Sequence, residues 1–212
     1  MMTSMGESAT KLPVSAVILA GGKSRRFGQD KSLLVLAGQS LIERAVARLA
    51  PLSDEILVIA NEPDRYEALD LPVRFVADQV RGLGSLMGIY SGLSAARHQH
   101  ALVVACDMPF LSESLLRYMI PLAADSDVVI PRLGRMLEPL HAIYGQACLP
   151  HMAKLLDRRE SKITAFFENV TVRYVEEDEI ARFDPEHLSF LNVNQPEDWH
   201  RVQEIHARLE NG

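Results

Sequence analysis

Short apolar runs alternate with amphipathic helical stretches along most of this chain. Runs rich in aliphatic residues, the pattern of strands covered on both faces, occur at residues 14–20, 55–60, 73–78, 101–107 and 127–131. The helical pattern occupies residues 41–50, 86–97 and 112–120. This order predicts a mostly parallel, twisted sheet between two layers of helices, a three-layer α/β/α fold of Rossmann-like topology.

The pattern changes after Leu137. Further strands are expected at residues 140–145, 170–175 and 188–193, and helices at residues 149–157 and from Pro196 onward. We therefore expect a small antiparallel part in the C-terminal half. Trp199 is expected to pack the last helix onto the sheet.

Size and charge bound the organisation of the chain. Its 212 residues, 48% hydrophobic and 24% charged, suit one domain. We expect a flexible lead-in at 1–12 and a single domain at 13–212, since no repeat or linker interrupts the pattern. The net charge of −6 argues against a nucleic-acid partner. The N-terminal segment lacks both a secretory signal and a membrane span, so we expect a cytoplasmic protein.

A segment rich in glycine and basic residues, 19–32 (LAGGKSRRFGQDKS), follows the first expected strand. Ligands of open α/β sheets lie at the carboxyl ends of the strands. Gly21 and Gly22 permit close approach of the backbone, whose N–H groups can surround phosphate oxygens. Positive charge comes from Arg25, Arg26 and Lys31. The segment predicts a binding loop for a triphosphate.

Two well-known glycine-rich loops do not fit this segment. The dinucleotide pattern G-x-G-x-x-G is absent. The tail of a P-loop is present at Gly22, Lys23 and Ser24, but Val17 stands where the first glycine belongs. The simpler alternative is a basic surface loop that closes a turn.

Two aspartates end expected strands at the same edge of the sheet. Asp107 closes the run 101–107, and Asp78 closes the run 73–78. A carboxylate at such a place can hold Mg²⁺ together with phosphate oxygens and water. The alternative for Asp107 is an aspartate that caps the turn before Pro109, and Asp78 has the same alternative. Two acids and one basic loop at one edge favour a functional site.

The loop 19–31 resembles the L-A-G-G-x-S-x-R-M-G-x-D-K loop of the molybdenum cofactor guanylyltransferases, which belong to the α/β nucleotidyltransferases. The likeness continues, in order, through the segments ADQVRGLGSLMGIYSGL, VVACDMPFL, EPLHAIYG and FLNVNQPEDW. It covers the chain from Val14 to about Trp199. The resemblance implies transfer of GMP from GTP to the terminal phosphate of molybdenum-molybdopterin, with release of pyrophosphate and with Mg²⁺, or Mn²⁺ in its place, as the metal.

The resemblance also implies roles for individual residues. The nucleotide-binding residues would be Leu19, Ala20, Gly21, Gly22, Lys31, Asp78 and Asp107. The first three would line the guanine and ribose side, and Lys31 would meet the phosphates. The catalytic residues would be Arg26, Lys31 and Asp107, of which Asp107 would bind the metal. Asn192 and Asn194 match the family's late N-V-N and would lie on the pterin side.

The sequence departs from the family pattern at several positions. Phe27 replaces methionine, Ser85 replaces proline, and Gln195 replaces threonine. An asparagine that some relatives use for the nucleotide would fall at Ile59, which leaves the role of the nearby Asn61 open.

Other functions remain as alternatives. The first is a molybdopterin cytidylyltransferase or another nucleotidyltransferase of the same fold, although L-A-G-G, in place of the L-A-A-G of the CTP-using relatives, favours GTP. The second is a non-catalytic nucleotide-binding module, against which the presence of both Lys31 and Asp107 argues. Protein partners would be molybdenum-insertion proteins or molybdoenzymes. His141 is expected to be a strand histidine near the substrate cleft and no metal ligand.

Overall fold

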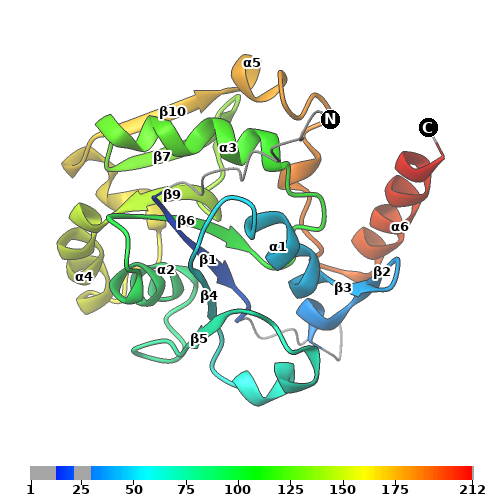
Figure 1. Ribbon diagram of the computed structural model, residues 1–212. Helices are drawn as coiled ribbons and strands as arrows, with labels where there is room; N and C mark the ends of the chain where they lie inside the picture. The colour runs from blue at the N-terminus through cyan, green and yellow to red at the C-terminus, as the bar shows by residue number, and fades with distance from the viewer. Residues whose placement is uncertain (1–12, 22–29, 212) are drawn as a thin grey trace, which may run out of the picture.

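The computed structural model describes residues 13–21 and 30–211, and these residues contain one large sheet between layers of helices (Figure 1). Its eight strands run in the order β10-β7-β9-β6-β1-β4-β5, with β8 beside β7. They are β1 (Ser15–Leu19), β4 (Ile56–Ile59), β5 (Arg74–Val76), β6 (His100–Ala105), β7 (Val128–Leu133), β8 (Met136–Leu137), β9 (His141–Gly145) and β10 (Val172–Glu176).

The sheet is mostly parallel, as the alternation of strands and helices predicts. Strand β1 pairs in parallel with β4 and β6, β4 with β5, and β10 with β7. Strand β9 runs antiparallel between β6 and β7, and β8 runs antiparallel to β7. The expected antiparallel part in the C-terminal half is therefore confirmed. Because β9 is reversed, its first residue lies at the edge where the parallel strands end.

Besides the strands, the described residues form six helices and six 3₁₀ turns. The helices are α1 (Leu41–Leu49), α2 (Ser85–Ala95), α3 (Glu113–Leu122), α4 (Leu149–Asp157), α5 (Glu177–Ile180) and α6 (Pro196–Glu210). The 3₁₀ turns are η1 (Lys31–Leu33), η2 (Pro63–Leu69), η3 (Ala123–Asp125), η4 (Gln146–Cys148), η5 (Ile163–Asn169) and η6 (Leu188–Phe190). Within the described ranges, none of the helices has the length and apolar character that crossing a bilayer requires.

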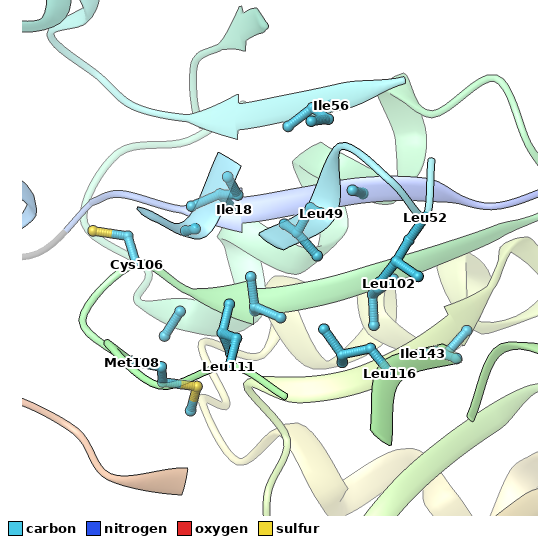
Figure 2. Close-up of a cluster of buried hydrophobic side chains, with 14 of the residues drawn as sticks. Ile18, Leu49, Leu52, Ile56, Leu102, Cys106, Met108, Leu111, Leu116 and Ile143 are labelled. Carbon is cyan, nitrogen blue, oxygen red and sulfur yellow. The ribbon is translucent and has the colours of Figure 1, made fainter. Parts of the chain in front are cut away.

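Helices cover both faces of the sheet because successive strand residues point to opposite sides. Val17 belongs to the apolar cluster that contains α2 and α4, whereas Ile18 belongs to the cluster that contains α1 and α3. Figure 2 shows the second cluster, in which Leu49 of α1 and Leu116 of α3 lie with Ile18 over the sheet. The two clusters form the core and hold the strand ends in fixed register.

The helix starts follow the capping residues in the sequence. Ser40 accepts a hydrogen bond from the Glu43 backbone, and the Glu43 carboxylate accepts one from the Ser40 backbone, which completes a capping box. Ser112 likewise caps α3. Pro196 is the first residue of α6, where its missing N–H costs nothing.

The prediction of a strand at residues 188–193 is wrong. Residues Leu188–Phe190 form the turn η6, and the following residues run past the sheet without joining it. Ser189 donates its backbone N–H to Asp184, and Val193 donates to the Asp107 carbonyl at 3.0 Å. These bonds to loop groups replace the ladder bonds that the apolar pattern suggested.

The expected packing of Trp199 on the main sheet is also wrong. A small hairpin, β2 (Val35–Leu36) and β3 (Gln39–Ser40), turns through Ala37 and Gly38, both at positive φ. Helix α6 packs on this hairpin, at the side of the molecule (Figure 1). Trp199 contacts the buried cluster of Leu34, Leu36, Leu41, Val193 and Val202.

A tight contact between α2 and β1 yields a stability prediction. A methyl group at Gly92 would lie 2.5 Å from Val17 Cγ1 and 3.3 Å from Ile59 Cδ1, both in the sheet core. Alanine favours a helix by about 1 kcal/mol over glycine, but overpacking costs about 1–3 kcal/mol. We expect Gly92→Ala to lower the free energy of unfolding by about 1 kcal/mol, measured by urea denaturation. The exposed Ser94 of the same helix supplies the control Ser94→Ala, and a Gly92→Ala protein more stable than wild type would contradict the packing argument.

Candidate functional site

Chemically active residues from several strands meet at the carboxyl edge of the sheet. The register pairs Leu19 of β1 with Ile59 of β4 and with Ala105 of β6. The hydrogen-bonded ladder continues past the strand ends, since the Ala20 N–H donates to Ile59 and the Cys106 N–H donates to Leu19. Residues 19–21 therefore lie between the chain that leads to Asp107 and the chain that leads away from β4.

Lys31 and Asp107, far apart in the sequence, meet at this edge. Lys31 Nζ lies 3.7 Å from Asp107 Oδ2, and the two side chains are 17% and 25% exposed. Burial raises the pKa of Asp107 above its ordinary value, while the Lys31 ammonium opposes that rise. A partly buried cation and carboxylate side by side suit a polyanion that is bound together with a metal.

Asp78 lies two residues beyond β5 and pairs with Asn61. The Asn61 amide donates to Asp78 Oδ2 at 2.7 Å, and the Asp78 backbone N–H donates to Asn61 Oδ1 at 3.2 Å. Ile59 is 3% exposed inside β4. Ile59 is therefore part of the core, and the side-chain amide at this edge belongs to Asn61. The sequence signal was its place directly after a buried strand, like that of the two aspartates.

One carboxylate oxygen of Asp78 has an open acceptor site. Asp78 Oδ1 is buried and has no hydrogen-bond partner among the described residues. A methyl group built on Gly88 of α2 would lie 3.8 Å from this oxygen and 3.1 Å from Leu19 Cδ2. The glycine thus keeps open the space beside both side chains. Because an unpaired buried acceptor is costly, this oxygen suits a ligand that donates a hydrogen bond.

The expected pterin-side asparagines lie beside the Asp107 backbone. The bond from Val193 N to the Asp107 carbonyl places their segment there. The Asn192 amide donates to the Phe190 carbonyl, and the backbone of the exposed Asn194 donates to Asp198 at 2.8 Å. The structure thus brings Asn192 and Asn194 to the same edge as Lys31 and Asp107. The expected site residues Gly22 and Arg26, and the expected lead-in at 1–12, lie outside the described residues.

The donor set at the edge fits a hard cation that a phosphate shares. Among residues 13–21 and 30–211, no three histidine, cysteine, aspartate or glutamate side chains converge on one point. Mg²⁺ needs few protein ligands, since it binds one or two carboxylates and takes its other oxygens from phosphate and water. The Asp107 carboxylate, partly exposed beside Lys31, can be such a ligand.

His141, at the start of β9, is a strand histidine, as expected. It is fully buried opposite Val104, and its ring packs edge-on against Phe190 at 4.9 Å. Neither ring nitrogen has a hydrogen-bond partner among the described residues. Burial lowers the pKa of His141 to about 4, although the charge of Asp184 opposes this shift. The ring is therefore neutral near pH 7.

The buried imidazole predicts a loss of stability in acid. The unfolded histidine has a pKa of about 6.5, so the unfolded chain binds the extra proton as the pH falls from there toward about 4. From pH 7 to pH 5, wild type should lose about 2 kcal/mol more unfolding free energy than His141→Leu, measured by urea denaturation. Equal losses would contradict this prediction, as would NMR titration of His141 with a pKa near 6.5.

Comparison with known proteins assigns the chain to a family. A profile of the MobA-like NTP transferase domain matches residues 16–174. The chain belongs to this family. The matched region runs from β1 into β10 and contains Lys31, Asp78 and Asp107. Asn192 and Asn194 lie beyond the end of the region that matches the MobA-like NTP transferases.

Relatives of the MobA-like NTP transferase chain extend the likeness beyond that region. A probable molybdenum cofactor guanylyltransferase of Pelotomaculum thermopropionicum is 37% identical over 187 residues, which are 88% of this chain and 90% of the relative. The molybdenum cofactor guanylyltransferase of Desulfosudis oleivorans is 34% identical over 192 residues, 90% of this chain and 94% of the relative.

A solved structure confirms the expected fold. The crystal structure of molybdopterin-guanine dinucleotide biosynthesis protein A from Archaeoglobus fulgidus is similar with a TM-score of 0.80 and 28% identity. The similarity covers 92% of this chain and 100% of that chain. The mixed α/β sheet is therefore shared over nearly the whole chain.

Proposed function

We propose that this chain is a metal-dependent guanylyltransferase that transfers GMP from GTP to the terminal phosphate of molybdenum-molybdopterin and releases pyrophosphate. The observation that carries the proposal is the Lys31–Asp107 pair beside residues 19–21, at the edge where α/β sheets bind ligands. The guanylyltransferase names of relatives at 34% and 37% identity support GTP as the donor. The chain acts in the cytoplasm as one nucleotidyltransferase domain over residues 13–212.

The nucleotide occupies the edge formed by β5, β4, β1 and β6. Leu19, Ala20 and Gly21 line its base and ribose side, with Gly22 next in the chain. Asp78 Oδ1 accepts a hydrogen bond from the nucleotide, which supplies the partner that this buried oxygen lacks among the described residues. Asn61 holds the other oxygen of Asp78 and so fixes the direction of the carboxylate.

The reaction joins two anions, so it depends on position and charge. The terminal phosphate oxygen of the acceptor attacks the α-phosphorus of GTP in line with the departing pyrophosphate. The Lys31 ammonium, assisted by Arg26, neutralises charge on the phosphates. Asp107 would hold Mg²⁺, or Mn²⁺, which when bound supplies further positive charge at the phosphates. Asn192 and Asn194 lie beside the Asp107 backbone and face the pterin side. The protein partners are molybdenum-insertion proteins or molybdoenzymes.

Two measurements test this function. With Mg²⁺ present, GTP at about 100 times its Kd should stabilise the protein by about 2.7 kcal/mol, while CTP, UTP and ATP should stabilise it less. Pyrophosphate should then be released from GTP when molybdenum-loaded molybdopterin is added. A stronger effect of CTP would indicate a cytidylyltransferase. Binding of GTP without release of pyrophosphate would indicate a non-catalytic module, and either result would refute the proposal.

A further inference from the structure

Tyr66 is a buried tyrosine whose hydroxyl group lies beside the candidate site. It belongs to η2, which follows β4, and is 2% exposed. Its ring stacks on Phe75 of β5, with ring centroids 5.6 Å apart and planes within 10°. The stacking accounts for the ring, but the hydroxyl group needs polar partners because burial of an unpaired hydroxyl is costly.

The partners of the hydroxyl come from two separate segments of the site. Tyr66 Oη lies 3.3 Å from the Ala20 carbonyl, at the end of β1. It also lies 3.2 Å from Asp30 Oδ2 and 3.0 Å from Ser32 Oγ, at the start of η1. The hydroxyl therefore joins the end of β1 to η1.

A count of protons makes Tyr66 the donor in this group. Ser32 has one hydroxyl proton, and Ser32 Oγ donates it to Asp30 Oδ1 at 2.7 Å. Ser32 Oγ is then left to accept, as are the Ala20 carbonyl and Asp30 Oδ2. The single Tyr66 proton is shared among these three acceptors. A phenylalanine at this position would leave all three without that donor.

Asp30 and Ser32, the two residues at the start of η1 that contact the Tyr66 hydroxyl, flank Lys31 in the chain. Asp30 is the N-cap of η1, and its carboxylate also accepts from the Ser32 backbone N–H at 3.1 Å. Arg65, the neighbour of Tyr66 in η2, lies 3.4 Å from Asp30 Oδ2. Lys31 lies between the two tethered residues, and its ammonium lies 3.7 Å from Asp107. The position of that ammonium thus depends on how firmly η1 is held.

We propose that Tyr66 is a positioning residue, whose hydroxyl sets Lys31 against Asp107 by fastening η1 to the end of β1. It touches neither the nucleotide nor the reacting atoms and acts through Lys31. The kinetic part of this inference rests on the proposed function, whereas the fastening of η1 does not.

The substitution that tests the hydroxyl alone is Tyr66→Phe, which keeps the ring and its stacking on Phe75. The matched control is Tyr118→Phe, which removes a hydroxyl bonded to Glu179 at 2.5 Å, between α3 and α5. In the ligand-free protein, hydrogen exchange should quicken at least fivefold at the Leu33 and Leu34 amides, which bond to Asp30 and Lys31. The control should leave these amides unchanged. Equal protection of η1 in Tyr66→Phe and wild type would overturn the proposal, whether or not the chain is a guanylyltransferase.

Kinetics test the consequence for the site. Tyr66→Phe should lower kcat/KM for GTP about tenfold, partly through a higher KM, since a misplaced Lys31 ammonium binds the phosphates less well in both GTP and the transition state. When Tyr66→Phe is added to Lys31→Met, kcat/KM for GTP should fall by less than a further twofold, because the effect of Tyr66 passes through Lys31. Effects that multiply in the double variant would overturn the positioning role. A wild-type chain without guanylyl transfer would refute the proposed function instead, and the exchange result would still decide whether Tyr66 fastens η1.

Discussion

Replacing Asp107 with asparagine should lower kcat for pyrophosphate release by about a thousandfold with saturating GTP and Mg²⁺. The amide keeps the size of the carboxylate but removes the charge that would hold the metal. It also removes the negative charge that lies 3.7 Å from the Lys31 ammonium. Steady-state assays of pyrophosphate release measure the effect. The fold should persist, because Asp107 lies past the end of β6 and is 25% exposed.

The neighbouring Cys106 provides a control for local disturbance. Its side chain is 4% exposed and belongs to the core cluster of Figure 2, and burial raises the pKa of its thiol far above the usual range. The thiol is therefore protonated and lies in the core cluster, in contact with the Ser32 side chain. Cys106→Ala should lower stability and leave kcat within about threefold of wild type. An Asp107→Asn enzyme that turns over at nearly the wild-type rate would show that the metal assignment is wrong.

Replacing Lys31 with methionine should raise the Kd for GTP by about 10- to 100-fold, since a charge-assisted hydrogen bond contributes about 1.5–3 kcal/mol. Methionine keeps most of the length of the side chain, so the free energy of unfolding should change little. Titration calorimetry with GTP and Mg²⁺ measures the affinity, and urea denaturation measures the stability.

The exposed Lys154 of α4 provides a charge-matched control for Lys31. Lys154→Met removes the same charge from the protein, but from a helix on the face of the sheet that α2 covers. Its Kd for GTP should stay within about twofold of wild type. Equal GTP affinity in Lys31→Met and wild type would remove Lys31 from the phosphate site.

Most of the central sheet could be predicted because its strands are buried on both faces. A strand such as β6 is covered by apolar side chains on both faces. An uninterrupted apolar run like residues 101–105 therefore predicts a buried central strand. The capping residues Ser40 and Ser112 mark helix starts because their hydroxyls satisfy backbone N–H groups locally. Local rules of this kind need no knowledge of the tertiary fold.

The errors arose where contacts from distant segments decide the structure. The run 188–193 is as apolar as a strand, but its backbone bonds to Asp184 and Asp107. Trp199 packs on a hairpin of two-residue strands, which are too short for a periodic signal. Tyr66 was missed because one tyrosine outside any motif carries no signal until its neighbours are known.

The sequence by itself determined the order of the main strands and helices of the central sheet, the edge at which Asp78 and Asp107 would emerge, and the resemblance that pointed to the family. These features follow from apolar periodicity and from the rule that parallel strands end together. Only the tertiary structure decided that Lys31 reaches Asp107, that Asn61 pairs with Asp78, and that the Tyr66 hydroxyl lies at the start of η1. Such contacts join residues from separate loops, and the distance between two side chains of that kind is set by the packing of the whole core.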